Sequence, residues 1–397
     1  MTETWLANVR LVDLDLATQA AAAVRIVDGT IEAIAAAPPA GAVTLDLGGR
    51  FLLPGVVTVH THLSIVFPFN DTDEEEDPAL TALRAAERAH AALFAGATTV
   101  RCIHEQHRID ITVREAARRG WFRAPRILAG GRALSTPGGH GQGAGSAYAQ
   151  GPDAFYAAAV AELEAGADHL KIFITGGLAH AGESPDVSEM TDAEIGAVVR
   201  AAGEAGTYVV AHAGHHAAIR QALDQGVTSF EHAYAVDEAT AALLARPGIY
   251  VSPTLSVTRS ESWMRANHFE EHSIANARAA SGEHLLSIQR LIAAGVTLTN
   301  GTDYPPGDDC GGVPAFVAEM GFMHQAGLSV VDTLRSATLN GAALCRIDDH
   351  VGRVARGYVA DLIAVDDDPL ADIAAMGGIS FVMQAGIVLR DDRLGTR

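Results

Sequence analysis

Two histidines separated by one residue, His60 and His62, end a hydrophobic run that begins at Leu52. Residues two apart in a strand lie on the same face, so both imidazoles would project together from the end of a buried strand. One cation could then be bound by both rings, since imidazole nitrogen is a common zinc ligand. The pair predicts half of a metal site, and ligands at other strand ends would complete it.

Four later apolar segments also end on side chains that can bind a metal ion. These residues are Lys171, His212, His232 and Asp303. The histidines and the aspartate supply nitrogen and oxygen ligands of the kind that zinc prefers, with no cysteine thiolate required. The coincidence of ligands at five strand ends therefore predicts a metal site.

Lys171 is unusual in such a set because a protonated amine is repelled by a dication. A buried lysine loses its proton readily, and the neutral amine can take up carbon dioxide to form a carbamate that bridges two metal ions. The alternative is a lysine that points outward from the end of its strand. Composition alone does not separate the two.

The middle of the chain has the pattern needed to position these ligands. From residue 54 to residue 345, apolar β-type segments alternate with alanine-rich helical segments, which is typical of βαβ units and a parallel sheet. About eight such repeats predict an α/β fold of the (β/α)8 TIM barrel type, whose active sites lie at the C-terminal ends of the strands. The predicted strands are 56–60, 98–102, 126–129, 167–171, 208–212, 229–232, 250–253 and 297–300.

The two ends of the chain have a different pattern, short apolar strands joined by turns. Asp28-Gly29 separates two such strands and indicates a tight hairpin turn. Because neither end has enough strands to be stable alone, we expect the ends to pair into one small β-sandwich domain. The predicted domains are therefore residues 1–53 with 346–397 for the sandwich, and 54–345 for the barrel.

Composition and charge exclude several classes of function. Of the 397 residues 48% are hydrophobic, which is enough for a large core, and the formal net charge is −20. So acidic a chain is unsuited to nucleic acid or to an anionic membrane. The three cysteines have no spacing typical of a disulfide framework or a zinc site, and neither a signal peptide nor a membrane span is indicated. We expect a cytoplasmic protein with a small-molecule substrate, and assembly into a homo-oligomer stays open.

The chain resembles the amidohydrolase superfamily over nearly its whole length. The stretch 171–177 and the Glu231-His232 step are similar to the imidazolonepropionase-like and prolidase-like branch, although Ala233 stands where a glycine commonly follows the ligand histidine. The wider resemblance rests on Pro54-Gly55 before His60-x-His62, on Lys171, His212, His232 and Asp303, and on the closing segments Gly352-x-Val354 and Ala360-Asp361-Leu362.

This resemblance implies a binuclear zinc hydrolase. Two dications lower the pKa of a bridging water enough to give hydroxide near neutral pH, and one of them polarises the scissile carbonyl. Asp303 would accept the proton and pass it to the leaving nitrogen, unless it serves as a ligand only. The implied ligands are His60, His62 and Asp303 for one Zn²⁺, His212 and His232 for the other, and a carboxylated Lys171 that bridges the two.

Two residues are predicted to contact the substrate. His140 lies in the glycine-rich segment 136–141, where its ring and the backbone amides could bind a carboxylate or an oxyanion; the alternative is a plain surface loop. Tyr234 could donate to the tetrahedral intermediate. The acidic run 71–77 is either a solvated loop or a lid that selects cationic substrates. Further histidines near strand ends that could line the pocket are His104, His107, His180 and His215.

We predict hydrolysis of an amide bond in a dipeptide or an N-acyl amino acid. A cyclic amide, a urea, a carbamate or an ester stays open as the substrate, because the shape of the pocket and not the metal ligands decides this. A catalytically inactive metal-binding protein is the third hypothesis. The ligand set with Asp303 argues against it, since a structural zinc needs only four closed ligands.

Overall fold

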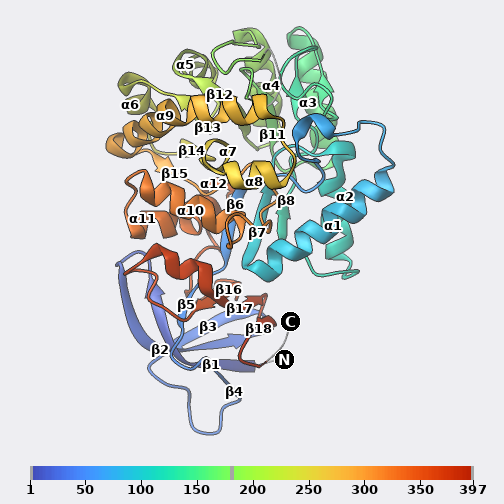
Figure 1. Ribbon diagram of the computed structural model, residues 1–397. Coiled ribbons are helices and arrows are strands. Elements are labelled where there is room, and N and C mark those ends of the chain that lie inside the picture. Colours follow the sequence, from blue (N-terminus) through green and yellow to red (C-terminus); the bar gives the residue numbers. More distant parts are fainter. Residues whose placement is uncertain (1–2, 179–182, 395–397) are drawn as a thin grey trace.

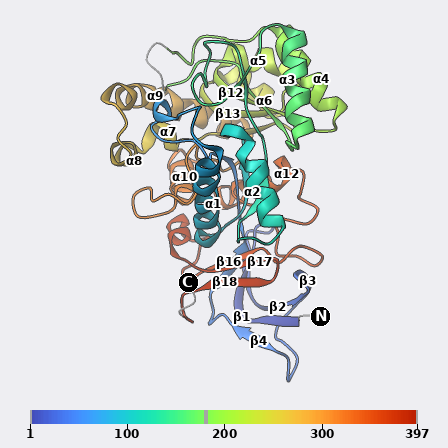
Figure 2. The ribbon, with the colours of Figure 1, turned by 90° about the vertical axis from the view of Figure 1, so that its right-hand side faces the viewer.

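The computed structural model describes residues 3–178 and 183–394. Figure 1 shows two parts, an upper one in which helices surround parallel strands and a lower one that is a sheet built from both ends of the chain. The described chain begins and ends in the lower part (Figures 1 and 2). The upper part carries the predicted ligands.

Among the described residues, the strands of the upper part form a three-stranded sheet in the order β6-β7-β8 and a seven-stranded sheet in the order β10-β9-β11-β12-β13-β14-β15. Every neighbouring pair is parallel. Each of the eight predicted strand regions overlaps one of these strands, although β11 begins three residues later than predicted. Their bounds are β6 (Val56–Thr61), β7 (Ala97–Cys102), β8 (Arg126–Leu128), β9 (Leu134–Ser135), β10 (Ala147–Tyr148), β11 (Leu170–Phe173), β12 (Val209–His215), β13 (Ser229–Ala235), β14 (Tyr250–Ser252) and β15 (Thr297–Leu298).

Backbone hydrogen bonds connect the two sheets at both junctions. Val59 N in β6 donates to Asn300 O just after β15 at 2.8 Å, and Asp168 N donates to Ala129 O just after β8 at 2.7 Å. The parallel strands and their order agree with the predicted barrel. The described ladders themselves, however, form two sheets rather than one continuous ring.

Helices cover the strands of the upper part, and local signals set their ends. Thr191 and Glu194 form a capping box at the start of α4, while Asp77 caps α1, which ends at Gly96 in a left-handed conformation. The helices are α1 (Pro78–Ala95), α2 (Ile109–Arg118), α3 (Pro152–Ala165), α4 (Asp192–Glu204), α5 (His216–Asp224), α6 (Glu238–Leu244), α7 (Ser256–Arg259), α8 (Glu261–Ala266), α9 (Glu271–Ala294), α10 (Ala315–Gln325), α11 (Val330–Ser336) and α12 (Leu339–Leu344), with 3-10 turns η1 (Phe69–Asp71), η2 (Gln106–Arg108) and η3 (Ile373–Gly378).

The lower part joins the two ends of the chain, as expected. Asp28 and Gly29 form the hairpin turn with positive φ angles of 46° and 84°, and the buried Arg50 pairs with Asp391 at 3.0 Å across the two ends. The strands are β1 (Glu3–Asp13), β2 (Thr18–Val27), β3 (Thr30–Ala35), β4 (Thr44–Asp46), β5 (Phe51–Pro54), β16 (Leu362–Val365), β17 (Ile379–Gln384) and β18 (Ile387–Asp391).

These described strands belong to one eight-stranded sheet, not to the two facing sheets of the expected sandwich. The reason lies in β5, which pairs with β1 in parallel on one side and with β16 antiparallel on the other. The two ends of the chain therefore join edge to edge. The domain boundaries drawn at residues 53 and 346 stay a prediction.

Within the described part of the chain, none of the helices combines the length and the apolar character that crossing a lipid bilayer demands.

Candidate active site

A cavity of about 770 Å³, part of it open to solvent, contains all of the predicted site residues in its lining. The structure therefore brings together side chains from six separate places in the sequence. The ligand-bearing elements are β6, β11, β12, β13 and the segment that follows β15. The predicted site residues in the lining are His60, His62, His140, Lys171, His212, His232, Tyr234 and Asp303.

Asp303 lies between the two histidines of the first strand. Its Oδ1 is 2.7 Å from Nε2 of His60 and 3.0 Å from Nε2 of His62. Both rings are held from behind: Nδ1 of His62 contacts the carbonyl of His104 at 2.8 Å, and Nδ1 of His60 contacts Glu231. Each histidine thus directs Nε2 toward Asp303, which leaves that nitrogen available to a metal ion.

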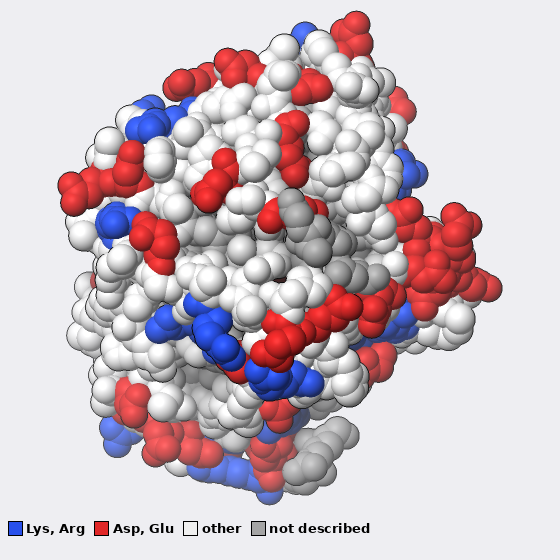
Figure 3. All heavy atoms as spheres, turned by 45° about the horizontal axis from the view of Figure 1, so that its top comes forward, with Lys and Arg blue, Asp and Glu red and all other residues white. Residues whose placement is uncertain are grey.

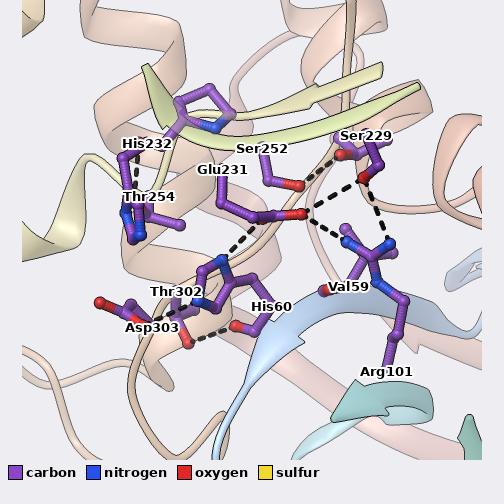
Figure 4. Close-up of polar contacts among 12 residues, drawn as sticks. Val59, His60, Arg101, Ser229, Glu231, His232, Ser252, Thr254, Thr302 and Asp303 are labelled. Carbon is purple, nitrogen blue, oxygen red and sulfur yellow. Dashed lines mark hydrogen bonds and ion pairs between the residues drawn. The ribbon is translucent and has the colours of Figure 1, made fainter. Parts of the chain in front are cut away.

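Glu231 and Arg101 form a buried charge pair beneath His60 that sequence reasoning did not assign. The Glu231 carboxylate lies 2.6 Å from Nδ1 of His60 and 2.7 Å from the Arg101 guanidinium. Figure 4 shows His60 between Glu231 and Asp303, with Arg101 on the far side of Glu231. Burial opposes ionisation of Glu231, but His60 and Arg101 outweigh it and lower its pKa to about 2. The ionised carboxylate orients His60 as carboxylates orient metal-bound histidines.

His212 and His232 lie side by side on the neighbouring strands β12 and β13, with ring centroids 4.4 Å apart. Nε2 of His212 faces the carbonyl of Gly176 at 3.1 Å, and Nδ1 of His232 contacts the hydroxyl of Thr254 at 2.6 Å (Figure 4). Each ring therefore keeps one nitrogen for a ligand. Ligand atoms of His60, His232 and Asp303 lie within 4.8 Å of one another. One cation could therefore bind all three, although the family resemblance assigned them to two different ions.

Lys171 is buried, and its amine has no hydrogen-bond partner among the described residues. Burial lowers the pKa of this amine to about 8, although Glu231 and Asp303 oppose the shift. Lys171 points into the cavity, not outward, and it is the only lysine in the chain. A buried amine without a partner beside five potential ligands fits a carbamate that ligates metal.

The donor set and the fold point to one known family. A model of the amidohydrolase family matches residues 51–388. The chain belongs to this family. Membership makes it a hydrolase that acts on C–N bonds.

Three relatives of this amidohydrolase are informative. Ochratoxinase of Aspergillus niger is 27% identical over 355 residues, which cover 81% of this chain and 71% of that one. A crystal structure of an amidohydrolase matches at a TM-score of 0.90 and 30% identity, over 98% of this chain and 99% of that chain. A prolidase in complex with N-methylphosphonate-L-proline matches at 0.89 and 27% identity, over 98% and 100%. The resemblance to the prolidase-like branch is thereby confirmed.

The electrostatics of the site keep Asp303 ionised. Burial opposes its charge, but His60 and the hydrogen bonds from His60 and His62 hold its pKa well below the usual value. Burial also lowers the pKa of His232 well below the usual value, so this ring is neutral and able to bind metal. The side chain of Asp303 is 26% exposed, and this exposed part faces the cavity.

Left-handed backbone conformations occur within β13 and in the segment after β15 of this amidohydrolase. His232, Ala233 and Asp303 have φ angles of 67°, 56° and 65°, a region that non-glycine residues seldom occupy. Ala233, which stands where a glycine is common, therefore occupies a conformation that glycine adopts at the lowest cost. The side chains of His232 and Asp303 both line the cavity.

His140 lies next to His212, with ring centroids 4.2 Å apart, and carboxylates of the protein surround it. Its Nδ1 contacts Glu183 at 2.8 Å, and its backbone N–H donates to Glu189 at 2.9 Å. Tyr234 stacks on His232 at 5.1 Å, and burial raises the pKa of its phenol well above the usual value. Tyr234 therefore stays protonated and can donate a hydrogen bond.

The other histidines named from the sequence behave differently from one another. His104 lines the cavity, but burial lowers its pKa to about 3, and both ring nitrogens contact backbone groups of Ala133 and Ala144. Neither His107 nor His215 is among the described lining residues. His180 lies outside the described residues.

The acidic run 71–77 is held against the loop that follows β9. Glu74 accepts hydrogen bonds from Gly145 N at 2.8 Å and from the Tyr148 hydroxyl at 2.9 Å. Figure 3 shows acidic side chains spread over this face of the molecule, with basic ones in smaller groups. Residues 71–77 do not contribute to the described cavity lining.

Proposed function

We propose that this amidohydrolase binds two Zn²⁺ ions bridged by a carboxylated Lys171 and hydrolyses an amide bond of a dipeptide or an N-acyl amino acid. One observation carries the proposal: the ionised, partly exposed Asp303 contacts two histidine nitrogens in a cavity that also contains the buried amine of Lys171, which has no hydrogen-bond partner among the described residues. Nitrogen and oxygen donors without thiolate suit zinc.

The metal ions would supply one part of the chemistry. Bound at this site, two dications lower the pKa of a shared water and polarise the scissile carbonyl. His60 and His62 turn Nε2 toward Asp303 in the cavity because Glu231 and the carbonyl of His104 contact their Nδ1 atoms. The described side chains thus already have the orientation that the ligands need.

Asp303 transfers a proton from the attacking water to the leaving nitrogen in this proposal. Its low pKa keeps it ionised, so it can accept a proton from the attacking water and then pass that proton to the leaving nitrogen. The protonated phenol of Tyr234 lies at the same cavity and can donate to the oxygen that develops negative charge. Asp303 is therefore a proton carrier in addition to a ligand.

The relatives support an amide substrate with a carboxylate. One similar structure is a prolidase in complex with N-methylphosphonate-L-proline, and another is an Xaa-Pro dipeptidase. In this chain, the His140 ring is the group near His212 that could face a substrate carboxylate. Glu183 and Glu189 beside it weaken such binding by repulsion.

This charge environment favours a second candidate, an uncharged cyclic amide, urea, carbamate or ester. Among the described lining residues, Lys171 is the only lysine or arginine, and as a carbamate it would not be cationic. A substrate carboxylate would then depend on His140 alone. An uncharged substrate needs no such partner.

The proposal also includes a closed barrel and a cytoplasmic location. We infer that the two parallel sheets close into one barrel through the junction contacts at Val59 and Asp168. A cytoplasmic location is consistent with the three cysteines, which are free and buried. The substrate is a small molecule, as the size of the cavity suggests.

A panel of compounds tests this function. The zinc-loaded protein is assayed with dipeptides and N-acyl amino acids, and with matched lactams, carbamates, esters and arylureas. Turnover confined to compounds with a free α-carboxylate is the expected result. Turnover confined to the uncharged compounds would replace the peptidase-like assignment with the second candidate, and absence of any turnover would overturn both.

A further inference from the structure

One side of the cavity is an aromatic wall, formed by Phe67, Met264, Phe269 and Tyr304. Phe67 and Phe269 stack with their centroids 6.4 Å apart and an interplanar angle of 19°. Phe67 meets the Tyr304 ring edge-on at 5.8 Å. Met264 and Tyr304 are buried, whereas Phe67 and Phe269 are only half-buried. The wall therefore presents two partly uncovered aromatic rings to the cavity.

The wall is held next to the reacting carboxylate. Tyr304 follows Asp303 directly in the chain, and its backbone carbonyl accepts a hydrogen bond from Thr61 at 2.8 Å. Its hydroxyl donates to the carbonyl of Ser256 at 3.2 Å, and Trp263 stacks behind its ring at 3.7 Å. These contacts fix Tyr304, so the wall keeps a constant position relative to Asp303.

The aromatic wall carries no charged side chain. A charged group placed against it would lose hydration without gaining a partner, which is unfavourable. An aromatic group would instead bury apolar surface and stack on Phe67 and Phe269, and such ring pairs are favourable beyond the burial alone. The wall thus discriminates by chemistry between apolar and charged groups.

We propose that the aromatic wall binds an aromatic side chain on the amine half of the scissile amide, so that the preferred substrates release an aromatic amino acid. This inference rests on the proposed amide hydrolysis and specifies its substrate. The amine half of the substrate is assigned to the wall because Asp303 gives its proton to the leaving nitrogen. Asp303 also adjoins the wall through Tyr304, the next residue in the chain. The leaving half of the substrate therefore lies against the wall.

The test combines a substrate series with a wall variant. Values of kcat/KM are measured for N-acetyl-L-phenylalanine, N-acetyl-L-alanine and N-benzoyl-L-alanine with the wild type, Phe269→Ala and Phe94→Ala. Phe94 is the matched control, a half-buried phenylalanine in α1 that contacts His90 and is not among the described lining residues. Calorimetric titration with L-phenylalanine, the amine product, measures binding without turnover.

The wild type is expected to prefer N-acetyl-L-phenylalanine over N-acetyl-L-alanine by about tenfold or more. Phe269→Ala should remove most of this preference and weaken L-phenylalanine binding by a similar factor, while Phe94→Ala changes neither. Equal rates for the phenylalanine and alanine compounds, a preference for N-benzoyl-L-alanine, or unchanged L-phenylalanine binding in Phe269→Ala would overturn the inference. Retained L-phenylalanine binding with no turnover of any amide would support the wall and overturn the proposed function.

Discussion

The carboxylate of Glu231 lies 2.6 Å from Nδ1 of His60, although 171 residues separate the two in sequence. Arg101 holds the other carboxylate oxygen at 2.7 Å, and all three side chains are buried. Because this arrangement fixes the ring of His60, the candidate metal site depends on a charge pair that contains none of the candidate ligands. The ionised Glu231 also makes His60 a stronger donor to a cation.

Replacing Glu231 with glutamine should weaken zinc binding by about tenfold or more, because the ring of His60 loses its anionic partner. Competition with a fluorescent zinc chelator measures the affinity. The matched control is Glu162→Gln, since Glu162 is also buried and pairs with Arg108 and Arg132 away from the cavity. The orienting role would be wrong if both variants bound zinc like the wild type.

Lys171 should react with carbon dioxide in the folded protein. Since it is the only lysine of the chain, NMR of the protein in ¹³C-labelled bicarbonate should show a single lysine carbamate signal. Lys171→Met should lack that signal and hold less zinc when measured by mass spectrometry of the metal content. Full zinc content in Lys171→Met would contradict a bridging role.

Gly301 should tolerate no side chain, because a Cβ there would lie 2.5 Å from Cβ of His60. Gly301→Ala is therefore expected to displace His60 and to lower the unfolding free energy by about 1–3 kcal/mol. Urea denaturation measures this change, and the rate of amide hydrolysis should fall as well. Gly282→Ala is the control, since Gly282 is exposed in α9 and no atom of its described surroundings lies within 4 Å of an added Cβ. This variant should be at least as stable as the wild type.

Glu76, which lies near the end of the acidic run 71–77, should make the stability of the protein depend on pH. The hydrogen bond from Arg84, 2.8 Å long, lowers the pKa of Glu76 to about 2. A carboxylate whose pKa is lowered by folding stabilises the protein above its unfolded value of about 4.5, and this stabilisation is lost as the pH falls toward 2. Glu76→Gln should lower the free energy of unfolding by roughly 1 kcal/mol at pH 7 and by less at pH 3. The effect is this small because solvent screens a partly exposed pair.

The neighbouring Glu75 provides the control for this pH effect, because it is exposed in the same run. Urea denaturation of Glu76→Gln, Glu75→Gln and the wild type at pH 7, 4 and 3 gives the three curves. Parallel curves for the two variants would show that the pair with Arg84 does not set the pH dependence.

Local patterns predicted much of this molecule. The apolar runs that end at His60, Lys171, His212 and His232 are strands, and their ends meet at one cavity because parallel strands align their carboxyl ends. Residue type and spacing within a few positions carried that information. The meeting of the candidate ligands at one cavity could be predicted for the same reason.

Contacts between distant residues had no such signal. The sequence did not indicate that Glu231 would meet Arg101 across 130 residues, because a buried charge in an apolar run has no local periodicity. The edge-to-edge pairing of β5 with β16 was missed for a related reason, since alternating residues predict strands but not which edges meet. Phe67 and Phe269 lie between regular elements, so only the structure shows the wall that they form.

The most direct test of the account compares wild type and Asp303→Asn at equal, measured zinc content, with the best amide of the substrate panel. Chelation should abolish wild-type turnover and added Zn²⁺ should restore it, while zinc-loaded Asp303→Asn should be slower by about 100-fold or more because it cannot carry the proton. Wild-type turnover that survives complete removal of metal, or an Asp303→Asn variant as fast as the wild type, would contradict the account.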